Sequence, residues 1–395
     1  MKKVAIFCDE SLFGGVIRTG MAELCDSFAN ALASVVDKDG RSRFAVCVVC
    51  PDRPGPLQRL AQSVEMREGY RFGRVLRVDY YLIPEDDFVS RSASVLDLIE
   101  PDILHCFAFP EVLSMMAQRP SRAVYTIEQG DPVRNKVEDL RRYDAITTVS
   151  RQYYRELLEG EDALADFLST ANFRALPIGI TTEVFSPAAG LRLPASYTSD
   201  KQGGKMLCKR RVLETYGIPG NPALYLMACR FVSCKGIEEV LVELGRIKAS
   251  GGFVLFVGRG DAEYEKRLRA LTRADGGLWV EKWASIAQVL PLLAAADFFL
   301  CPSKHETGGL MPLKACRYGA IPIAAQTGGL AENLDERVAV MIGDGGLSDA
   351  LDRAANLYDD PMRLIAKRKA SMEADFSWKN RIRGYVEIYG MEERA

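Results

Sequence analysis

One segment of the sequence, CPSKHETGGLMPLKACRYG, combines a carboxylate with two glycines at the expected start of a helix. Glu306 precedes Gly308 and Gly309, and an apolar run ends just before them. Backbone N–H groups at a helix start have no intrahelical partner, so glycines there let a phosphate or another anionic leaving group approach closely. The Glu306 carboxylate can accept hydrogen bonds from sugar hydroxyls. The alternative is that Glu306 only complements the helix dipole.

Two cations follow an earlier apolar run. In MACRFVSCKGIEEV, Arg230 and Lys235 lie five positions apart across a short turn. Two cations at the end of a strand can converge on a diphosphate and offset the charge that develops as it departs. Without further information such a pair more often belongs to a solvent-exposed face. A phosphate site and a solvent-exposed pair therefore both stay open at this point.

Two glycine-rich loops add candidate contacts to phosphate. FVLFVGRGD places Gly258 and Gly260 directly after another apolar run, although such glycines often serve only to tighten a turn. Near the N-terminus, DESLFGGVIRTGMAEL supplies backbone amides and a cation before a long helical pattern, and a purely structural turn is again the alternative. The candidates in this second loop are Gly14, Gly15, Arg18, Thr19 and Gly20.

The elements that must position these residues alternate along the chain. Short apolar runs rich in Val, Ile and Phe, typical of parallel strands buried on both faces, are separated by amphipathic helical patterns. The β-α alternation is expected throughout, which predicts an α/β fold with a doubly wound sheet present twice. Ligands of such sheets bind beyond the carboxyl ends of the strands, and the loops described above follow those ends.

Composition limits the classes of function. The chain has 395 residues, 48% of them hydrophobic, which is enough for two domains of about 190 residues. A formal net charge of −2 argues against sequence-independent nucleic-acid binding. The N-terminal residues read as a first strand, and no stretch approaches the roughly 18 apolar residues of a membrane span, so we expect a cytoplasmic protein. The sequence does not indicate an oligomeric state.

Cysteine and histidine usage argues against metal or redox chemistry. Most of the ten cysteines lie in apolar runs, where a thiol behaves as a small buried hydrophobe. Cys47 and Cys50 form a C-x-x-C within a strand-like run, which directs their side chains to opposite faces. With two histidines and one such pair, we expect no zinc site.

The segment PSKHETGGLMPLKACRYGAIPIAAQTGGLAEN resembles the donor site of glycogen and starch synthases and, more loosely, of family-four glycosyltransferases. The resemblance implies a GT-B fold, with two Rossmann-like domains facing each other across a cleft. It also implies that Glu306 holds donor sugar hydroxyls and that Arg230 and Lys235 match the R-x4-K-G pair that binds the distal phosphate. Further donor contacts implied on this segment are His305, Thr307, Gly308, Gly309, Leu310, Thr327, Gly328 and Gly329.

Resemblance extends to other parts of the chain. Arg18-Thr19-Gly20 is similar to the phosphate-binding K-T-G-G loop of the synthases, while Gly14-Gly15 is alternatively similar to the family-four G-G loop. LPIGITTEVFSP resembles the hinge, and FSWKNRIRGYVEIY resembles a helix that crosses back to the first domain. We therefore expect an acceptor-side domain over residues 1–183, a nucleotide-sugar donor domain over 184–375 and a returning helix over 376–395.

The acceptor half departs from the synthase pattern. The run LHCFAFPEVL keeps His105 but has Ala108 where the synthases carry an aspartate, and TIEQGDPV has Glu128 where they carry a histidine. Glu128 is either a catalytic carboxylate or a salt-bridged residue. His105, in an apolar strand, is either an acceptor-side residue or a core histidine. Lys314 occupies the position of the second family-four glutamate, which the synthases also lack.

The expected function is retaining transfer of a hexose, with glucose as the first candidate, from an ADP- or UDP-sugar to a saccharide or another hydroxyl acceptor. The nucleotide sugar is a substrate, and we expect neither a cofactor nor a metal. Two other classes remain open: an epimerase or hydrolase of nucleotide sugars on the same scaffold, and a catalytically silent regulatory protein that binds a nucleotide sugar or a glucan. Release of nucleotide without an acceptor distinguishes the former, and donor binding without turnover distinguishes the latter.

Overall fold

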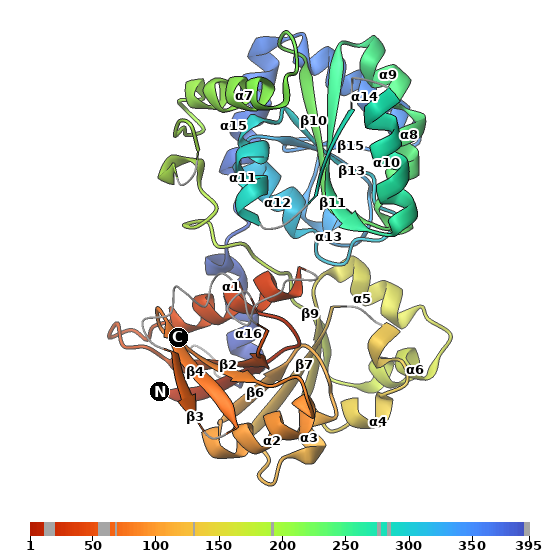
Figure 1. Cartoon of the computed structure of the whole chain (residues 1–395). Coiled ribbons are helices and arrows are strands. Elements are labelled where there is room, and N and C mark those ends of the chain that lie inside the picture. Colours follow the sequence, from red (N-terminus) through yellow and green to blue (C-terminus); the bar gives the residue numbers. More distant parts are fainter. Residues whose placement is uncertain are drawn as a thin grey trace. The chain divides into compact units, whose positions relative to one another are not determined.

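The computed structural model describes residues 1–11, 20–53, 64–67, 69–128, 131–190, 193–274, 278–282 and 286–390. The chain divides into two compact units, which Figure 1 labels by element. The first unit comprises Met1–Thr181 and Ser377–Ala395, and the second comprises Thr182–Phe376. Each unit is an α/β body built around its own sheet.

Within the described residues, the first unit contains a nine-stranded sheet in the order β3-β4-β5-β2-β1-β6-β7-β8-β9. Its strands are β1 (Lys2–Phe7), β2 (Phe44–Pro51), β3 (Val64–Arg67), β4 (Tyr70–Val75), β5 (Val78–Ile83), β6 (Ile103–Cys106), β7 (Arg122–Ile127), β8 (Ala145–Thr148) and β9 (Phe173–Ala175). Its helices are α1 (Met21–Ala33), α2 (Phe88–Ile99), α3 (Val112–Met115), α4 (Val137–Leu140), α5 (Arg151–Leu158), α6 (Ala163–Thr170) and α16 (Trp378–Ile388), with a 3₁₀ turn η2 (Asp131–Val133).

The β-α alternation expected throughout the sequence is wrong between residues 64 and 83. There β3, β4 and β5 follow one another, and β4 pairs antiparallel with both neighbours. Only Leu76 and Arg77 separate β4 from β5. A connection this short can only reverse the chain, whereas a parallel crossover needs a dozen or more residues. The other neighbouring strands of this sheet pair in parallel, as predicted.

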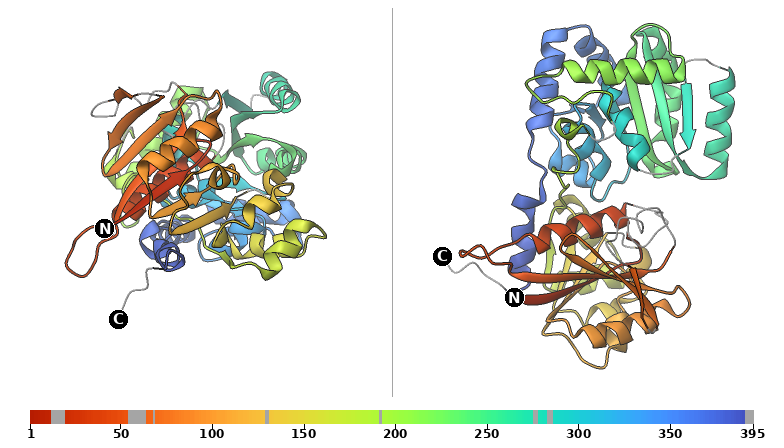
Figure 2. Two further views of the ribbon diagram at one scale, coloured as in Figure 1. Left: turned by 90° about the horizontal axis from the view of Figure 1, so that it is seen from below. Right: turned by 60° about the vertical axis from the view of Figure 1, so that its left-hand side comes forward.

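The C-terminal helix α16 belongs to the first unit. It packs beside α1, as the blue and red helices show in Figures 1 and 2, and Trp378 Nε1 donates a hydrogen bond to Ser27 Oγ at 3.0 Å. Phe28 of α1 contacts the rings of both Trp378 and Tyr385. The last helix therefore completes the core of the unit in which the chain begins.

Within the described residues, the second unit contains a six-stranded parallel sheet in the order β12-β11-β10-β13-β14-β15. Its strands are β10 (Ala223–Phe231), β11 (Gly252–Gly260), β12 (Leu278–Lys282), β13 (Phe298–Cys301), β14 (Ile321–Ala324) and β15 (Val340–Met341). Its helices are α7 (Gly203–Tyr216), α8 (Ile237–Val242), α9 (Leu244–Ala249), α10 (Ala262–Ala274), α11 (Ile286–Ala295), α12 (Leu310–Arg317), α13 (Gly328–Asn333), α14 (Gly346–Tyr358) and α15 (Pro361–Glu373), with 3₁₀ turns η3 (Pro187–Ala189) and η4 (Ser233–Lys235).

Helices cover both faces of this second sheet, with α7 and α11 on one side and α9 and α10 on the other (Figure 1). Burial on both faces explains why strands such as β10 and β13 are continuous apolar runs. The helical pattern over residues 236–250 is divided into α8 and α9 at Glu243. The doubly wound α/β architecture predicted from the sequence is present in both units.

Candidate active site

The order of strands in the second unit changes direction between β10 and β13. The chain passes from β10 outward to β11 and β12, and then returns to the other side of β10 with β13, β14 and β15. The loops after β10 and β13 therefore leave the sheet toward opposite sides, and the crevice between them is where doubly wound sheets bind ligands. Lys235 lies in the first loop and Glu306 in the second.

The two loops pack directly against each other. Lys304 N donates a hydrogen bond to the carbonyl oxygen of Cys234 at 2.8 Å. Gly236 adopts φ +75°, and a methyl group added there would overlap the carbonyl oxygen of Pro302. Glycine is required at this position both for the left-handed backbone and for the close approach of the second loop.

Lys235 and Glu306 form an ion pair at this junction. Lys235 Nζ donates to Glu306 Oε2 at 2.7 Å, and Ser303 Oγ donates to the same oxygen at 3.3 Å. The two charged side chains are only 16% and 18% exposed. Burial by itself lowers the pKa of Lys235, but the charge and the hydrogen bond of Glu306 outweigh burial, so the pKa is raised. The lysine is therefore a charged ammonium at neutral pH.

The loop after β14 holds the backbone of Glu306. Gly329 N donates to the carbonyl oxygen of Glu306 at 2.8 Å, and Thr327 Oγ1 donates to the carbonyl oxygen of Lys304 at 3.2 Å. Gly328 has φ +44°, and a methyl group on it would overlap the carbonyl oxygen of Glu306. The Thr327-Gly328-Gly329 loop thus fixes the main chain from which the Glu306 side chain projects.

Helix α12 begins beside this carboxylate. Its N-cap is Gly309, with φ +74°, and a methyl group there would lie 3.0 Å from Leu330 Cδ2. The N–H groups of the first helical turn have no intrahelical partner and form the positive end of the helix dipole. Gly308 is buried, while Thr307 and Leu310 are half-buried and His305 is exposed. The structure therefore brings Glu306, Lys235 and a helix N-terminus together in one unit, an arrangement suited to a sugar joined to a phosphate.

Arg230 and Gly258 occupy neighbouring strands. Arg230 is the penultimate residue of β10 and is exposed, and its side chain forms no hydrogen bond or ion pair with the residues that the structure describes. Gly258 lies in β11 opposite Cys229, and a methyl group on it would overlap the Cys229 carbonyl oxygen. Close packing of strands accounts for this glycine without a ligand.

In the first unit, the predicted loop lies largely outside the described residues: this applies to Gly14, Gly15, Arg18 and Thr19. Gly20 is described and is the exposed N-cap of α1. Glu128 directly follows β7 and is half-buried. Among the donor-side candidates of this unit, Gly20 alone has a described position.

His105 lies in the core of the first unit. It is fully buried, with Nδ1 2.6 Å from Tyr389 Oη and Nε2 2.7 Å from Thr126 Oγ1. Its ring stacks on Phe107 with centroids 4.6 Å apart. Burial lowers the pKa of His105 to about 3, so the imidazole is neutral at physiological pH. This geometry supports the core interpretation, in which His105 anchors the segment after α16 to the sheet.

Two residues near the site were not candidates from the sequence. Ser303 donates a hydrogen bond to the Glu306 carboxylate. Its position shortly after the apolar run of β13 could have marked it as a site residue from the sequence. Lys314 is only 1% exposed and places its ammonium 4.6 Å from the centroid of the Phe185 ring, a cation–π contact. Phe185 belongs to the hinge-like motif LPIGITTEVFSP, so the contact with Lys314 joins α12 to the first residues of the second unit.

A family model described as "Glycosyl transferases group 1" matches residues 223–360, the part that contains Lys235, Glu306 and the Thr327-Gly328-Gly329 loop. The catalytic domain of starch synthase IV from Arabidopsis thaliana, bound to ADP and acarbose, has a similar structure, with a TM-score of 0.84 over 98% of this chain and 99% of that one at 19% identity. This chain has the GT-B fold, and it is similar to glycogen and starch synthases.

Curated proteins that are similar to this chain include the glycogen synthase of Opitutus terrae, 29% identical over 262 residues, which are 62% of this chain and 55% of the relative. The glycogen synthase of Thioalkalivibrio sulfidiphilus is 28% identical over 347 residues, 73% of this chain and 71% of the relative. The chain spans about half the length of the Opitutus terrae glycogen synthase. No helix within the described residues is long and apolar enough to cross a membrane.

Proposed function

We propose that this protein is a retaining hexosyltransferase that moves a hexose, with glucose as the first candidate, from a nucleoside diphosphate sugar to a saccharide or another hydroxyl acceptor. The ion pair between Lys235 and Glu306 carries the proposal, because a carboxylate able to accept from sugar hydroxyls and a cation able to bind a phosphate lie together at the switch point of a sheet that matches the group 1 model. The relatives that are glycogen synthases, and the starch synthase structure bound to ADP, favour an ADP-sugar, with a UDP-sugar as the alternative.

In the proposed reaction the bond between the anomeric carbon and the diphosphate breaks, and its electron pair leaves with the diphosphate. The acceptor hydroxyl oxygen forms the new bond to the anomeric carbon on the same face, and its proton passes to the departing phosphate oxygen. Lys235 has three N–H donors, so it can keep its bond to Glu306 and donate to a phosphate oxygen at the same time. Arg230, exposed at the end of β10, supplies a second cation. Their charges, with the N–H groups at Gly308, Gly309 and Leu310, offset the negative charge on the leaving group. No metal is part of this proposal.

Glu306 is proposed to accept hydrogen bonds from hydroxyls of the transferred sugar. An ionised carboxylate has several acceptor positions, so the one occupied by Lys235 does not exclude a second donor. His305, Thr307, Thr327, Gly328 and Gly329 are proposed to line the donor pocket. Glu128, at the end of β7, is proposed to stabilise positive charge at the anomeric carbon or to bond a sugar hydroxyl. Residues 184–375 would then be the donor domain, and residues 1–183 with the helix over 376–395 the acceptor side.

Thermal melts with ADP, UDP, GDP and their glucose adducts test donor binding first. A ligand at about a hundred times its dissociation constant adds roughly 2.7 kcal/mol to the free energy of unfolding, so the preferred nucleotide is identified by a higher melting temperature. Nucleotide release is then measured against a panel of glucans and small saccharides, with and without EDTA, and proton NMR of the product reports the anomeric configuration.

Each result has a definite meaning. Release that requires an acceptor and leaves an α-linked product from an α-linked donor supports the proposal. Release of free glucose without an acceptor indicates a hydrolase instead. A melting temperature unchanged by every nucleotide contradicts the donor assignment, and loss of activity with EDTA contradicts metal independence.

A further inference from the structure

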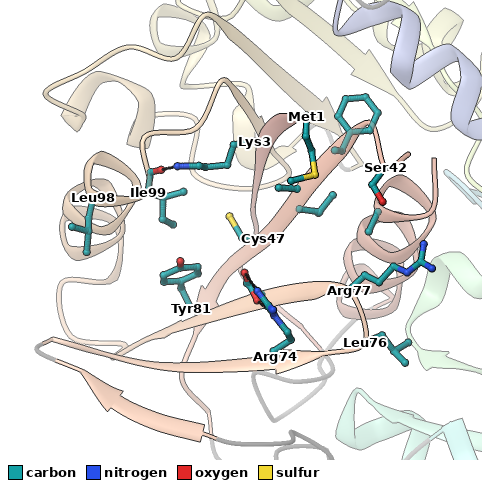
Figure 3. A pocket seen from close by; sticks show the side chains of 15 residues that line it. Met1, Lys3, Ser42, Cys47, Arg74, Leu76, Arg77, Tyr81, Leu98 and Ile99 are labelled. Carbon is teal, nitrogen blue, oxygen red and sulfur yellow. Dashed lines mark hydrogen bonds and ion pairs between the residues drawn. The ribbon is translucent and has the colours of Figure 1, made fainter. Parts of the chain in front are cut away.

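A groove with a volume of about 590 Å³ lies at the amino edge of the first sheet (Figure 3). It is bounded by the starts of β1 and β2, the turn between β4 and β5, and the end of α2. This volume lies within the range of small-molecule sites in proteins. Its polar and charged lining includes Lys3, Ser42, Cys47, Arg74, Arg77 and Asp79. The amino ends of the parallel strands are opposite the carboxyl ends that doubly wound sheets use for their substrates.

The charged residues of the groove carry an excess of positive charge. Lys3, Arg74 and Arg77 stand against a single carboxylate, Asp79. Arg74 Nη2 donates to Asp79 Oδ2 at 2.8 Å, and Arg74 Nε bonds the other carboxylate oxygen. Because Arg74 and Asp79 neutralise each other, Lys3 and Arg77 account for the excess.

Arg77 has its guanidinium available. The side chain is exposed and makes no hydrogen bond or ion pair within the part of the chain that the structure describes. It follows Leu76, which has φ +53°, an uncommon left-handed backbone for a leucine, in the two-residue connection between β4 and β5. This short, paired connection restricts the position of Arg77 at the rim of the groove.

Lys3 provides a second cation on the other side of Cys47, as Figure 3 shows. Its Nζ donates to the carbonyl oxygen of Ile99, the last residue of α2, at 2.5 Å. An ammonium has three donors, so two remain for a ligand. Ser42, whose exposed hydroxyl also lines the groove, adds a neutral donor.

The floor between the two cations is apolar. Cys47 is 6% exposed, and it shares one apolar cluster with Ile99 and Tyr81, which also line the groove. Burial raises the pKa of the Cys47 thiol to about 12, with Asp79 adding to the rise and Lys3 opposing it. Asp79 is the residue directly opposite Cys47 in the pairing of β2 with β5. A ligand would therefore rest its body on an apolar floor and its charge against the rim.

We propose that this groove binds a small organic oxyanion, a carboxylate or a phosphate ester that carries a ring or a short apolar body. Arg77 binds the oxyanion at the rim, the floor around Cys47 accepts the ring, and Lys3 offers a further donor beyond that floor. Because the groove lies at the end of the strands opposite the substrate edge, its ligand acts as an effector and not as the donor or acceptor.

Isothermal titration calorimetry on the full chain tests the proposal, with phenyl phosphate and benzoate as probes and benzyl alcohol as the uncharged comparison. We expect one site for an anionic probe. We expect Arg77→Gln to weaken binding about tenfold, as loss of a charge-assisted hydrogen bond does. Ser42→Glu, which adds a carboxylate to the groove, should weaken binding independently. Arg91→Gln, on the exposed side of α2, is the matched control and should leave the affinity unchanged.

Several outcomes would overturn the proposal: no binding of either anionic probe, equal affinity for benzyl alcohol, or equal losses in Arg77→Gln and Arg91→Gln. Displacement of the probe by ADP would also overturn it, because the probe would then occupy the nucleotide site. Comparison of phenyl phosphate with benzoate distinguishes a phosphate ligand from a carboxylate ligand, and binding of either one supports the oxyanion site.

Discussion

Lys235 and Glu306 are joined by a hydrogen-bonded ion pair of 2.7 Å although 71 residues separate them along the chain. The pair exists because β10 and β13 are neighbours, which brings the loops that follow them together. Its two side chains are mostly buried, so removal of either partner leaves the other charge poorly compensated.

Lys235→Ala is expected to reduce transfer by about 10²–10³-fold, because it removes a cation proposed to offset charge on the leaving diphosphate. The measurement is the rate of nucleotide release, with circular dichroism to establish that the variant is folded. Lys304→Ala is the matched control, since this exposed lysine of the neighbouring loop pairs with Glu239. Equal rates for the two variants would refute the role of Lys235.

Glu306→Gln is expected to lower both transfer and the pKa of Lys235. Burial disfavours the ammonium, and the carboxylate that outweighs burial would be gone. Since the folded pKa in the native protein is raised, the stabilising effect is fully present below about pH 10.5 and is lost as pH rises through the folded pKa. NMR titration of the lysine side chain measures the shift, with Glu239→Gln as the control. An unchanged pKa of Lys235 would contradict the pairing.

Gly328→Ala is expected to destabilise the second unit by about 1–3 kcal/mol and to weaken donor binding. The added methyl group would overlap the carbonyl oxygen of Glu306, and the backbone there is left-handed. Gly343→Ala is the matched control, because a methyl group on Gly343 meets nothing within 4 Å. Denaturant unfolding and nucleotide titration measure the two effects. If both variants behave like the native protein, the loop does not hold Glu306 as described.

His105 is expected to remain neutral from pH 8 down to below pH 5. Burial lowers its folded pKa to about 3, so between that value and the ordinary value near 6.5 the unfolded chain binds more protons. Stability therefore decreases as pH falls through this window, by up to about 1.4 kcal/mol per unit from this residue. The chain has only two histidines, so His305→Gln leaves one imidazole for NMR. A titration midpoint above pH 6 in that variant would contradict the buried, neutral state.

Local sequence was enough to predict the α/β class, strands β10 to β14 of the second unit and the helix that begins after Gly309, because apolar periodicity and glycine requirements are local properties. The short strand β15 was not predicted. Local sequence also identified Glu306 and Lys235 as candidates from their residue types and their positions after strands. The tertiary structure alone decided that these two side chains form a pair, since that depends on which strands become neighbours.

Other features were also beyond the reach of local patterns. The antiparallel β3-β4-β5 segment depends on how an edge of the sheet is completed. The choice between an acceptor-side and a core His105 rests on Tyr389, 284 residues away, because a strand residue's chemistry is set by the groups packed around it. Local sequence determines the helices and strands and supplies the reactive side chains, whereas long-range packing determines which of those side chains come into contact.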